Sequence, residues 1–272
     1  MDRVADHYAG ANDVVAAIAA SLKAAGKDLA HLTTADLASV DEFHIRGREA
    51  TLELARWLAP GPETRVLDIG SGLGGPARTL AETTGCRVTG IDLTPAFAAA
   101  ATALSQWVGL ADRLDFVVGD ATALPFGDAS FDAALSVHVS MNIADKARLY
   151  REARRVLRPG ARFVIYEVLA GEGGEVRFPV PWARDPSFSH LVTPEEMQNL
   201  LVAAGFRVAR VEDSTGRSQA WFEAMAARLA SGTSPAITFQ AFLGNDFPAM
   251  AKNQVLNLRE RRIRTVSWFC EA

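Results

Sequence analysis

Short apolar runs alternate with helical stretches of about ten to fifteen residues from residue 61 onward. This alternation is typical of βαβ units, in which helices connect neighbouring strands of a parallel sheet. The predicted strands are residues 65–69, 87–91, 114–118, 131–137, 162–168 and 206–212. The helices between them are predicted at residues 75–84, 95–108, 145–157 and 194–204. The pattern therefore predicts an α/β fold built around one sheet.

The last segment, residues 261–269, alternates basic or polar residues with apolar ones. It follows a helical region and needs no parallel crossover to reach the sheet. Such a segment suits an edge strand, and an antiparallel direction is compatible with it.

The first sixty residues predict helices rather than strands. Residues 12–25 carry apolar side chains at helical spacing, between the capping residues Asn12 and Asp13 and a terminating Gly26. Thr33 starts a capping-box pattern for a short helix, and residues 45–59 form a longer one. We therefore expect an N-terminal helical cap over residues 1–60 and a core over 61–272.

Two segments of the predicted core depart from the alternation. Residues 170–192 are rich in Gly, Pro and aromatic residues and are too long for an ordinary strand-to-helix connection. A lid over a site and a solvated excursion both fit that segment. Residues 216–257 read as a helical insertion, for which the sheet, the site and a partner subunit are all candidate contacts.

Charge and cysteine content exclude several kinds of protein. With Lys+Arg 28 against Asp+Glu 32, the chain has no basic excess to neutralise nucleic-acid phosphates. Cys86 and Cys270 lie too far apart for a disulfide framework or a zinc motif. The apolar run at residues 14–20 is too short to span a bilayer. We expect a cytoplasmic protein without a nucleic-acid or membrane partner; its oligomeric state is not determined by the sequence.

A glycine-rich turn follows the first predicted strand and opens a helix. Glycines in such a turn adopt backbone angles closed to other residues and allow a ligand to approach closely. Gly70, Gly72 and Gly75 fit the G-x-G-x-x-G spacing of dinucleotide sites, whereas Gly70, Gly72 and Gly74 fit G-x-G-x-G. The spacing alone leaves both cofactor classes open.

Three carboxylates follow three successive predicted strands. Asp68, two residues before the first glycine, would repel a pyrophosphate and attract an ammonium or sulfonium group. Asp92 stands where an acidic side chain accepts hydrogen bonds from ribose hydroxyls, and Asp120 is able to accept from an adenine amino group. Each one also has a purely structural interpretation as a cap, turn or loop residue. Together they predict a nucleoside site, and Asp68 favours a cationic cofactor.

The sequence resembles the class I S-adenosylmethionine-dependent methyltransferases through the motifs VLDIGSGLGG, GIDLTP, VVGDATALPFGDASFD and RVLRPGARFVIYE. The resemblance runs in order from about residue 43 to 269. It implies a Rossmann-like, doubly wound sheet of seven mostly parallel strands with an antiparallel last strand, and S-adenosylmethionine as cofactor, with S-adenosylhomocysteine as its product. By this resemblance, Asp68, Gly70, Gly72 and Gly74 surround the methionine part, Asp92 and Leu93 hold the ribose and adenine, Asp120 and Ala121 meet the adenine, and His138 lies beside the sulfonium.

Within that family, residues 42–51 are similar to the N-terminal helix of enzymes that methylate small amines, such as the sarcosine/dimethylglycine and phosphoethanolamine methyltransferases. The similarity implies that Phe43 and His44 contact the cofactor; a surface or capped histidine is the alternative for His44. Phosphoethanolamine methyltransferases place an Asp where this chain has His138, and a His where it has Asn142. Their acid-and-imidazole dyad is therefore not reproduced here.

Methyl transfer from a sulfonium is an in-line displacement that mainly requires positioning and exclusion of water. A hydroxyl or ammonium acceptor must also lose a proton, and histidine is the natural base. His138, just beyond the fourth strand, is the first candidate, with cofactor packing or a structural role as alternatives. Glu167, at the end of the fifth strand, is a second candidate, which would hold a cationic acceptor or take its proton. Tyr8 and Trp182 are candidate walls of the acceptor site, although core packing explains them equally well.

The sequence thus predicts an S-adenosylmethionine-dependent methyltransferase acting on nitrogen or oxygen of a small molecule, with an amine as one candidate acceptor. A nicotinamide-dependent oxidoreductase is the first alternative. A cofactor-binding protein without turnover is the second. The five histidines show no metal-binding spacing, so a metal-independent reaction is predicted.

Overall fold

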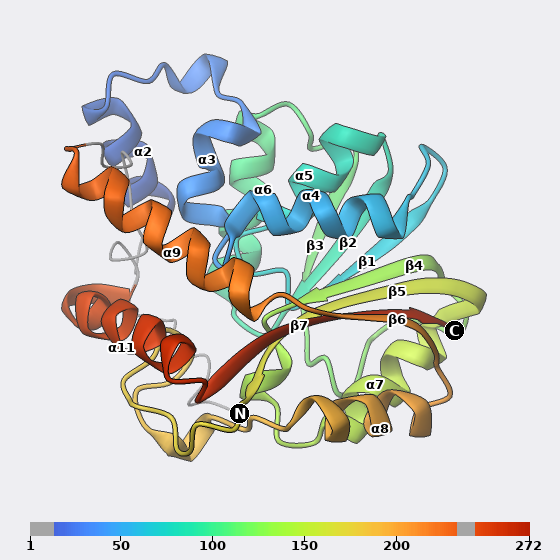
Figure 1. Ribbon diagram of the computed structural model, residues 1–272. Coiled ribbons are helices and arrows are strands. Elements are labelled where there is room, and N and C mark those ends of the chain that lie inside the picture. The colour runs from blue at the N-terminus through green and yellow to red at the C-terminus, as the bar shows by residue number, and fades with distance from the viewer. Residues whose placement is uncertain (1–13, 233–242) are drawn as a thin grey trace.

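The computed structural model describes residues 14–232 and 243–272. A seven-stranded sheet in the order β3-β2-β1-β4-β5-β7-β6 runs through the molecule (Figure 1). Its strands are β1 Arg65–Ile69, β2 Arg87–Asp92, β3 Leu114–Val118, β4 Phe131–Val137, β5 Leu157–Ala170, β6 Arg207–Asp213 and β7 Ile263–Glu271. Strands β1 to β5 are parallel, and β7 is antiparallel to both of its neighbours. The predicted fold class is confirmed.

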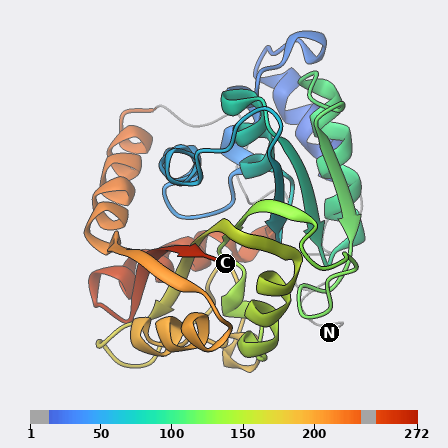
Figure 2. The same ribbon diagram turned by 90° about the vertical axis from the view of Figure 1, so that its right-hand side faces the viewer.

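The helices cover both faces of this sheet (Figures 1 and 2). They are α2 Val14–Ala24, α3 Thr34–Asp41, α4 Gly47–Leu58, α5 Gly75–Thr84, α6 Pro95–Trp107, α7 Lys146–Val156, α8 Pro194–Ala203, α9 Thr215–Ala230 and α11 Phe247–Arg259. Leu54 and Leu80 of α4 and α5 pack with Val164 of β5 on one face. Tyr150 and Leu201 of α7 and α8 pack on the other face. Burying each such side chain contributes about 1.5–3 kcal/mol.

The position predicted for the last strand is wrong in one respect. Strand β7 is antiparallel, but it lies between β5 and β6 instead of at the edge. The reason is that β6 takes the outer position and β7 fills the gap beside β5, so both sides of β7 are hydrogen-bonded. Its side chains are accordingly buried from Ile263 to Cys270 with few interruptions.

The N-terminal helices contact the core at different places. Helix α3 begins with the predicted capping box of Thr33 and Asp36, and the caps predicted at Asn12 and Asp13 lie outside the described residues. Helices α2 and α3 pack with α6 in one apolar cluster, whereas α4 packs directly on the sheet. A buried ion pair between Arg78 of α5 and Asp41 of α3, with Nη2–Oδ2 at 2.7 Å, fastens α3 beside the glycine-rich turn.

Residues 180–183 of the segment 170–192 are buried against the rest of the molecule, whereas residues 172–175 and 184–187 are exposed. Trp182 is 2% exposed and lies in an apolar cluster with Ile45, Met141 and Leu258. Asn253 of α11 donates to the carbonyl oxygen of Pro179 at 3.0 Å. The segment is therefore held against α11, next to the end of β4.

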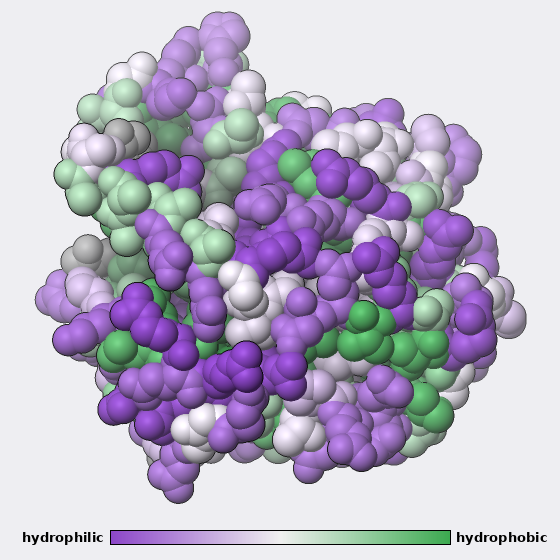
Figure 3. All heavy atoms as spheres, viewed as in Figure 1, coloured by the Kyte–Doolittle hydropathy of each residue, from purple (hydrophilic) through white to green (hydrophobic). Residues whose placement is uncertain are grey.

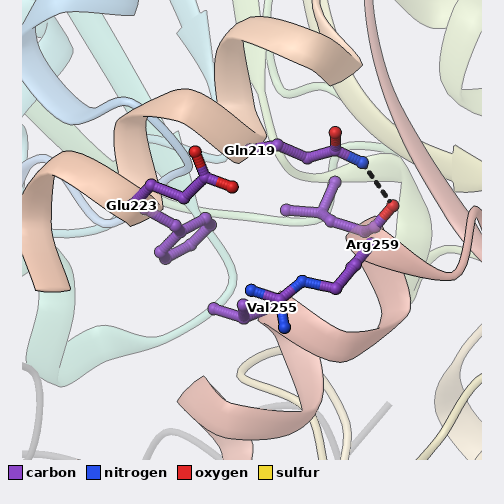
Figure 4. A pocket seen from close by; sticks show the side chains of 6 residues that line it. Gln219, Glu223, Val255 and Arg259 are labelled. Carbon is purple, nitrogen blue, oxygen red and sulfur yellow. Dashed lines mark hydrogen bonds between the residues drawn. The ribbon is translucent and has the colours of Figure 1, made fainter.

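Helices α9 and α11 lie side by side at the β6–β7 end of the sheet (Figure 1). The Gln219 side chain of α9 donates to the Leu258 carbonyl oxygen of α11 at 2.7 Å, and a small hollow lies between Glu223 and Arg259 (Figure 4). Hydrophilic side chains cover most of the face seen in Figure 3, with paler green spheres over the alanine-rich α9. Within the described ranges, none of the helices combines the length and apolar character needed to cross a bilayer.

Candidate active site

Asp68, near the end of β1, is the most unusual group of the site. It is 1% exposed, and its Oδ2 accepts no hydrogen bond from the described residues. Burial raises the pKa of this carboxyl to about 8, and the charges of Glu42 and Asp92 act in the same direction. A buried polar oxygen without a partner is costly, so Asp68 suits a ligand that brings a cationic hydrogen-bond donor.

The glycines of the turn meet different surroundings. Gly70 has φ 75°, and a Cβ atom there would lie 2.4 Å from Cγ2 of Val139 in the turn after β4. A Cβ at Gly74 would lie 2.7 Å from the Phe116 ring. At Gly72, with φ 51°, a Cβ would meet nothing within 4 Å. Gly70 thus lets two loops of the site approach each other, whereas Gly72 leaves open space where a ligand can approach the backbone.

Asp92 closes the glycine-rich turn from the end of β2. Its Oδ2 accepts from the backbone N–H of Gly72 at 2.9 Å, and its Oδ1 from that of Thr94 at 2.8 Å. Desolvation raises the pKa of this carboxyl. Leu93 beside it is half-buried. Each carboxylate oxygen of Asp92 retains a second lone pair that a ribose hydroxyl is able to use.

Asp120 follows β3 on a short turn. Its Oδ1 accepts from the backbone N–H of Thr122 at 2.8 Å and from the hydroxyl of the same residue at 2.9 Å. Ala121 is half-buried against the core cluster on the α7 and α8 face. The carboxylate therefore shapes its own loop, and its Oδ2 remains for a donor such as an adenine amino group.

Phe43 and His44 lie between α3 and α4, on the side of the sheet covered by α4 and α5. Phe43 packs with the cluster of α2, α3 and α6. The His44 Nε2 lies 2.9 Å from the Gly47 carbonyl oxygen and 3.2 Å from the Thr51 hydroxyl. Because the Thr51 hydroxyl donates to Glu42 and a carbonyl only accepts, Nε2 carries the proton. Burial lowers the pKa of His44 to about 4, so its imidazole is neutral.

His138 follows β4 with a left-handed φ of 54°. Its ring lies 5.9 Å from the ring of His44 and 4.7 Å from that of Tyr166, measured between centroids. Its Nε2 is buried without a hydrogen-bond partner among the described residues. Burial lowers the pKa of His138 well below its usual value, and His44 adds to the effect. The imidazole is therefore neutral, and in this buried position it is a weaker base than an ordinary histidine.

Glu167 is fully buried beneath the same turn. Its Oε1 accepts from the backbone N–H groups of Val139 and Ser140 at 3.2 and 2.9 Å. Burial raises the pKa of the Glu167 carboxyl to about 7. Because successive side chains of a strand point to opposite faces, Glu167 lies on the α7 face while Tyr166 lies beside His138. Glu167 thus supports the turn that carries His138.

The structure brings His44, His138, Asp68 and the glycine-rich turn to the carboxyl ends of β1 and β4. Asp120 and Ala121 lie farther along this edge, after β3, and Tyr8 lies outside the described residues. Glu42 was not predicted from the sequence; it is 1% exposed and accepts from the hydroxyls of Thr51 and Thr79, each at 2.6 Å. No local signal marks Glu42, because Thr79 is distant in the sequence and the burial arises from the packing of α3 on α5.

Comparison with known proteins gives a family for the central part of the chain. Residues 67–165 match the family model described as a methyltransferase domain. The sterol 24-C-methyltransferase ERG6B of Gibberella zeae is 40% identical over 116 residues, which cover 43% of this chain and 30% of that protein. The chain spans 30% of the length of this relative and 64% of that of the O-methyltransferase cnsE of Penicillium expansum.

Solved structures share the fold over most of the chain. The [4+2]-cyclase SpnF has a TM-score of 0.66 and 27% identity, over 82% of this chain and 80% of that one. The phosphoethanolamine N-methyltransferase 2 of Haemonchus contortus, in complex with S-adenosylhomocysteine, has a TM-score of 0.71 and 21% identity, over 94% and 60%. The chain therefore carries a methyltransferase domain on a class I methyltransferase fold. The cofactor used by this class of domain is S-adenosylmethionine.

Proposed function

We propose that the protein transfers a methyl group from S-adenosylmethionine to a nitrogen or oxygen atom of a small molecule. The observation that carries the proposal is the buried Asp68 carboxyl beside the glycine-rich turn, whose Oδ2 has no hydrogen-bond partner among the described residues. A cationic cofactor supplies the missing partner, whereas the pyrophosphate of a nicotinamide dinucleotide would be repelled there. The match of residues 67–165 to a methyltransferase domain supports the same conclusion.

Each site residue has a role in this proposal. Asp68 holds the positive methionine part, Asp92 and Leu93 the ribose and adenine, and Asp120 and Ala121 the far side of the adenine. Bound S-adenosylmethionine supplies an electrophilic methyl group on a sulfonium. The chain's own residues then have to align the acceptor, keep water out and take up one proton.

His138 is the proposed proton acceptor. It is neutral because burial lowers its pKa, and it lies on the turn directly after β4. His44 lies opposite and, being neutral, does not repel a cationic cofactor. Glu167 acts in this proposal by fixing the backbone of the turn. A direct role for Glu167 toward the acceptor stays a prediction.

The acceptor is proposed to be a small molecule, and an amine is one candidate. Residues 170–192 form the proposed lid over its site, because they pack against the turn that follows β4. The relatives carry names that refer to sterols and to phosphoethanolamine, among others, so the acceptor class differs between them. The predicted cytoplasmic location and independence from metal likewise stay predictions.

Thermal unfolding with S-adenosylmethionine, S-adenosylhomocysteine and NAD in parallel tests the cofactor. A ligand at 100 times its dissociation constant stabilises the folded state by about 2.7 kcal/mol, which raises Tm by several degrees. We expect the first two to raise Tm and NAD to leave it unchanged. A panel of small amines and alcohols, assayed for S-adenosylhomocysteine formation, then tests transfer. A rise with NAD alone contradicts the proposal.

A second candidate function, binding of the cofactor without methyl transfer, has support from one comparison. SpnF shares the fold but carries the name of a cyclase. A protein that binds the cofactor without transferring its methyl group would show the rise in Tm but form no S-adenosylhomocysteine with any acceptor. The two assays together therefore separate methyl transfer, cofactor binding alone and nicotinamide binding.

A further inference from the structure

We propose that Asn142 is a positioning residue that couples residues 170–192 to the turn carrying His138. The proposal rests on the proposed function, in which this turn supplies the proton acceptor. The turn consists of His138, Val139 and the short η2 helix Ser140–Asn142, so Asn142 is its last residue.

Asn142 makes the polar contacts that join the two parts. Its Nδ2 donates to the carbonyl oxygen of Trp182 at 2.8 Å and to that of Phe188 at 3.1 Å. The backbone N–H of His190 adds a bond to the Met141 carbonyl oxygen at 2.7 Å. One amide nitrogen thus ties together two points of the 170–192 segment and fixes both to the turn.

The residue type suits this arrangement. A carboxamide nitrogen carries two N–H groups, so one atom is able to donate to both carbonyl oxygens. An aspartate has the same shape but would place acceptor oxygens against two acceptors. A histidine has only one N–H on each ring nitrogen and would satisfy one of the two. Asn142 stands where the phosphoethanolamine methyltransferases have the His of their dyad. Here it serves instead as the donor to two carbonyl oxygens of the 170–192 segment.

Glu167 holds the middle of the turn from beneath, through the backbone N–H groups of Val139 and Ser140. His138 directly precedes Val139, and its left-handed backbone depends on this turn. Trp182 is packed into the apolar cluster, and its Nε1 donates to the Ser189 hydroxyl at 3.0 Å, so the segment is well ordered internally. A displacement of this segment by an acceptor would consequently reach the His138 imidazole through Asn142.

The test compares the unmodified protein with N142A, N142D and a matched control, N253A. Asn253 also donates to a carbonyl of the segment, that of Pro179, but it belongs to α11 and not to the turn. Hydrogen exchange of residues 180–191 measures how firmly the segment is held. The NMR signals of protein labelled with ¹³C-histidine report the environment of the His138 ring, and the H138Q variant assigns its signal.

We expect N142A to speed exchange in the segment by about tenfold or more, since two hydrogen bonds are lost, and to shift the His138 signal. N142D should have a larger effect on both the exchange rate and the His138 signal. N253A should speed exchange without shifting that signal. Unchanged exchange in N142A, or faster exchange with an unshifted His138 signal, would overturn the coupling. If either variant fails to fold, N142S provides the same two readouts.

These measurements need neither acceptor nor turnover. Binding of S-adenosylhomocysteine, followed by calorimetry on the same samples, reports separately whether the proposed cofactor binds. Failure of the proposed function and failure of the coupling are therefore distinguishable.

Discussion

The imidazole rings of His44 and His138 lie 5.9 Å apart and at 77° to each other, although one comes from the N-terminal helices and the other from the turn after β4. Burial lowers the pKa of both. Within the part of the chain that the structure describes, Glu42 is the only carboxylate within salt-bridge distance of either ring, with its Oε2 3.7 Å from Nε2 of His44. Both are therefore neutral, and their protonation is linked to stability.

The substitution H44Q should flatten the acid side of the stability profile. The pKa of His44 is about 4 in the folded protein and about 6.5 when unfolded. The unfolded chain thus takes up a proton first, and the wild-type protein loses stability as the pH falls from 6.5 to 4. Urea unfolding at pH 7.5 and pH 5 should show a smaller loss for H44Q. The exposed His31 provides the control variant H31Q; an equal flattening by H31Q would contradict the assignment.

The substitution D68N should separate cofactor binding from stability. The folded protein holds a proton on Asp68 up to a pKa of about 8, whereas the unfolded chain releases it near 3.8. Ligand-free wild type therefore loses stability as the pH rises between these values, and D68N should not. We expect D68N to melt higher at pH 7.5 but to bind S-adenosylhomocysteine at least about tenfold more weakly, because the charged partner is gone.

Calorimetric titration and melting curves from pH 5 to 8 measure both effects of D68N. The surface variant D128N, far from the glycine-rich turn in the sequence, is the control. If D68N binds S-adenosylhomocysteine as tightly as the wild type, Asp68 does not hold the cofactor, and the main support for the proposed function is lost.

The loss of stability caused by G70A should depend on the Val139 side chain, whereas the loss caused by G72A should not. Each requires a left-handed alanine, which costs about 1–2 kcal/mol. G70A adds a Cβ only 2.4 Å from Val139 Cγ2, whereas the Cβ of G72A meets nothing within 4 Å. Chemical unfolding should show that V139A restores part of the stability lost in G70A and none of that lost in G72A. Purely additive effects in both pairs would mean that the two loops do not press on each other.

The substitutions E167A and E167Q should show that this side chain acts as an acceptor for the turn. E167A leaves the N–H groups of Val139 and Ser140 without their acceptor, at a cost of about 1–3 kcal/mol. E167Q keeps one carbonyl oxygen and should be more stable than E167A. Since burial raises the pKa of Glu167 to about 7, wild type loses stability as the pH rises from 4.5 to 7, and E167Q should lack that slope.

Thermal melting at pH 5 and pH 7.5 measures both Glu167 variants. Equal stability of E167A and E167Q at either pH would argue against the support of the turn. Methyl transfer, once an acceptor is known, should fall in E167A together with the population of the native turn and recover largely in E167Q.

Much of the fold follows from local patterns. The predicted strand at residues 65–69 and the helix at 75–84 are found with the same bounds, because burial period, glycines and Pro76 are readable within each segment. The capping box at Thr33 is likewise a local arrangement. The place of β7 within the sheet was not predictable in this way, because it depends on where the crossover through α8 leaves β6.

The candidate site likewise contains residues that the local sequence predicts and contacts that it does not predict. Asp68, Asp92 and the glycines are recognisable because each stands at a fixed offset from the end of its own strand. The partners of Asn142, the support that Glu167 gives to the turn and the burial of Glu42 join segments far apart in the chain. The sequence by itself thus determined the fold class and the cofactor class, and it predicted the residues that are proposed to hold the cofactor. Only the tertiary structure decided which polar groups lose water and which partners they gain, because desolvation depends on neighbours that the local sequence does not contain.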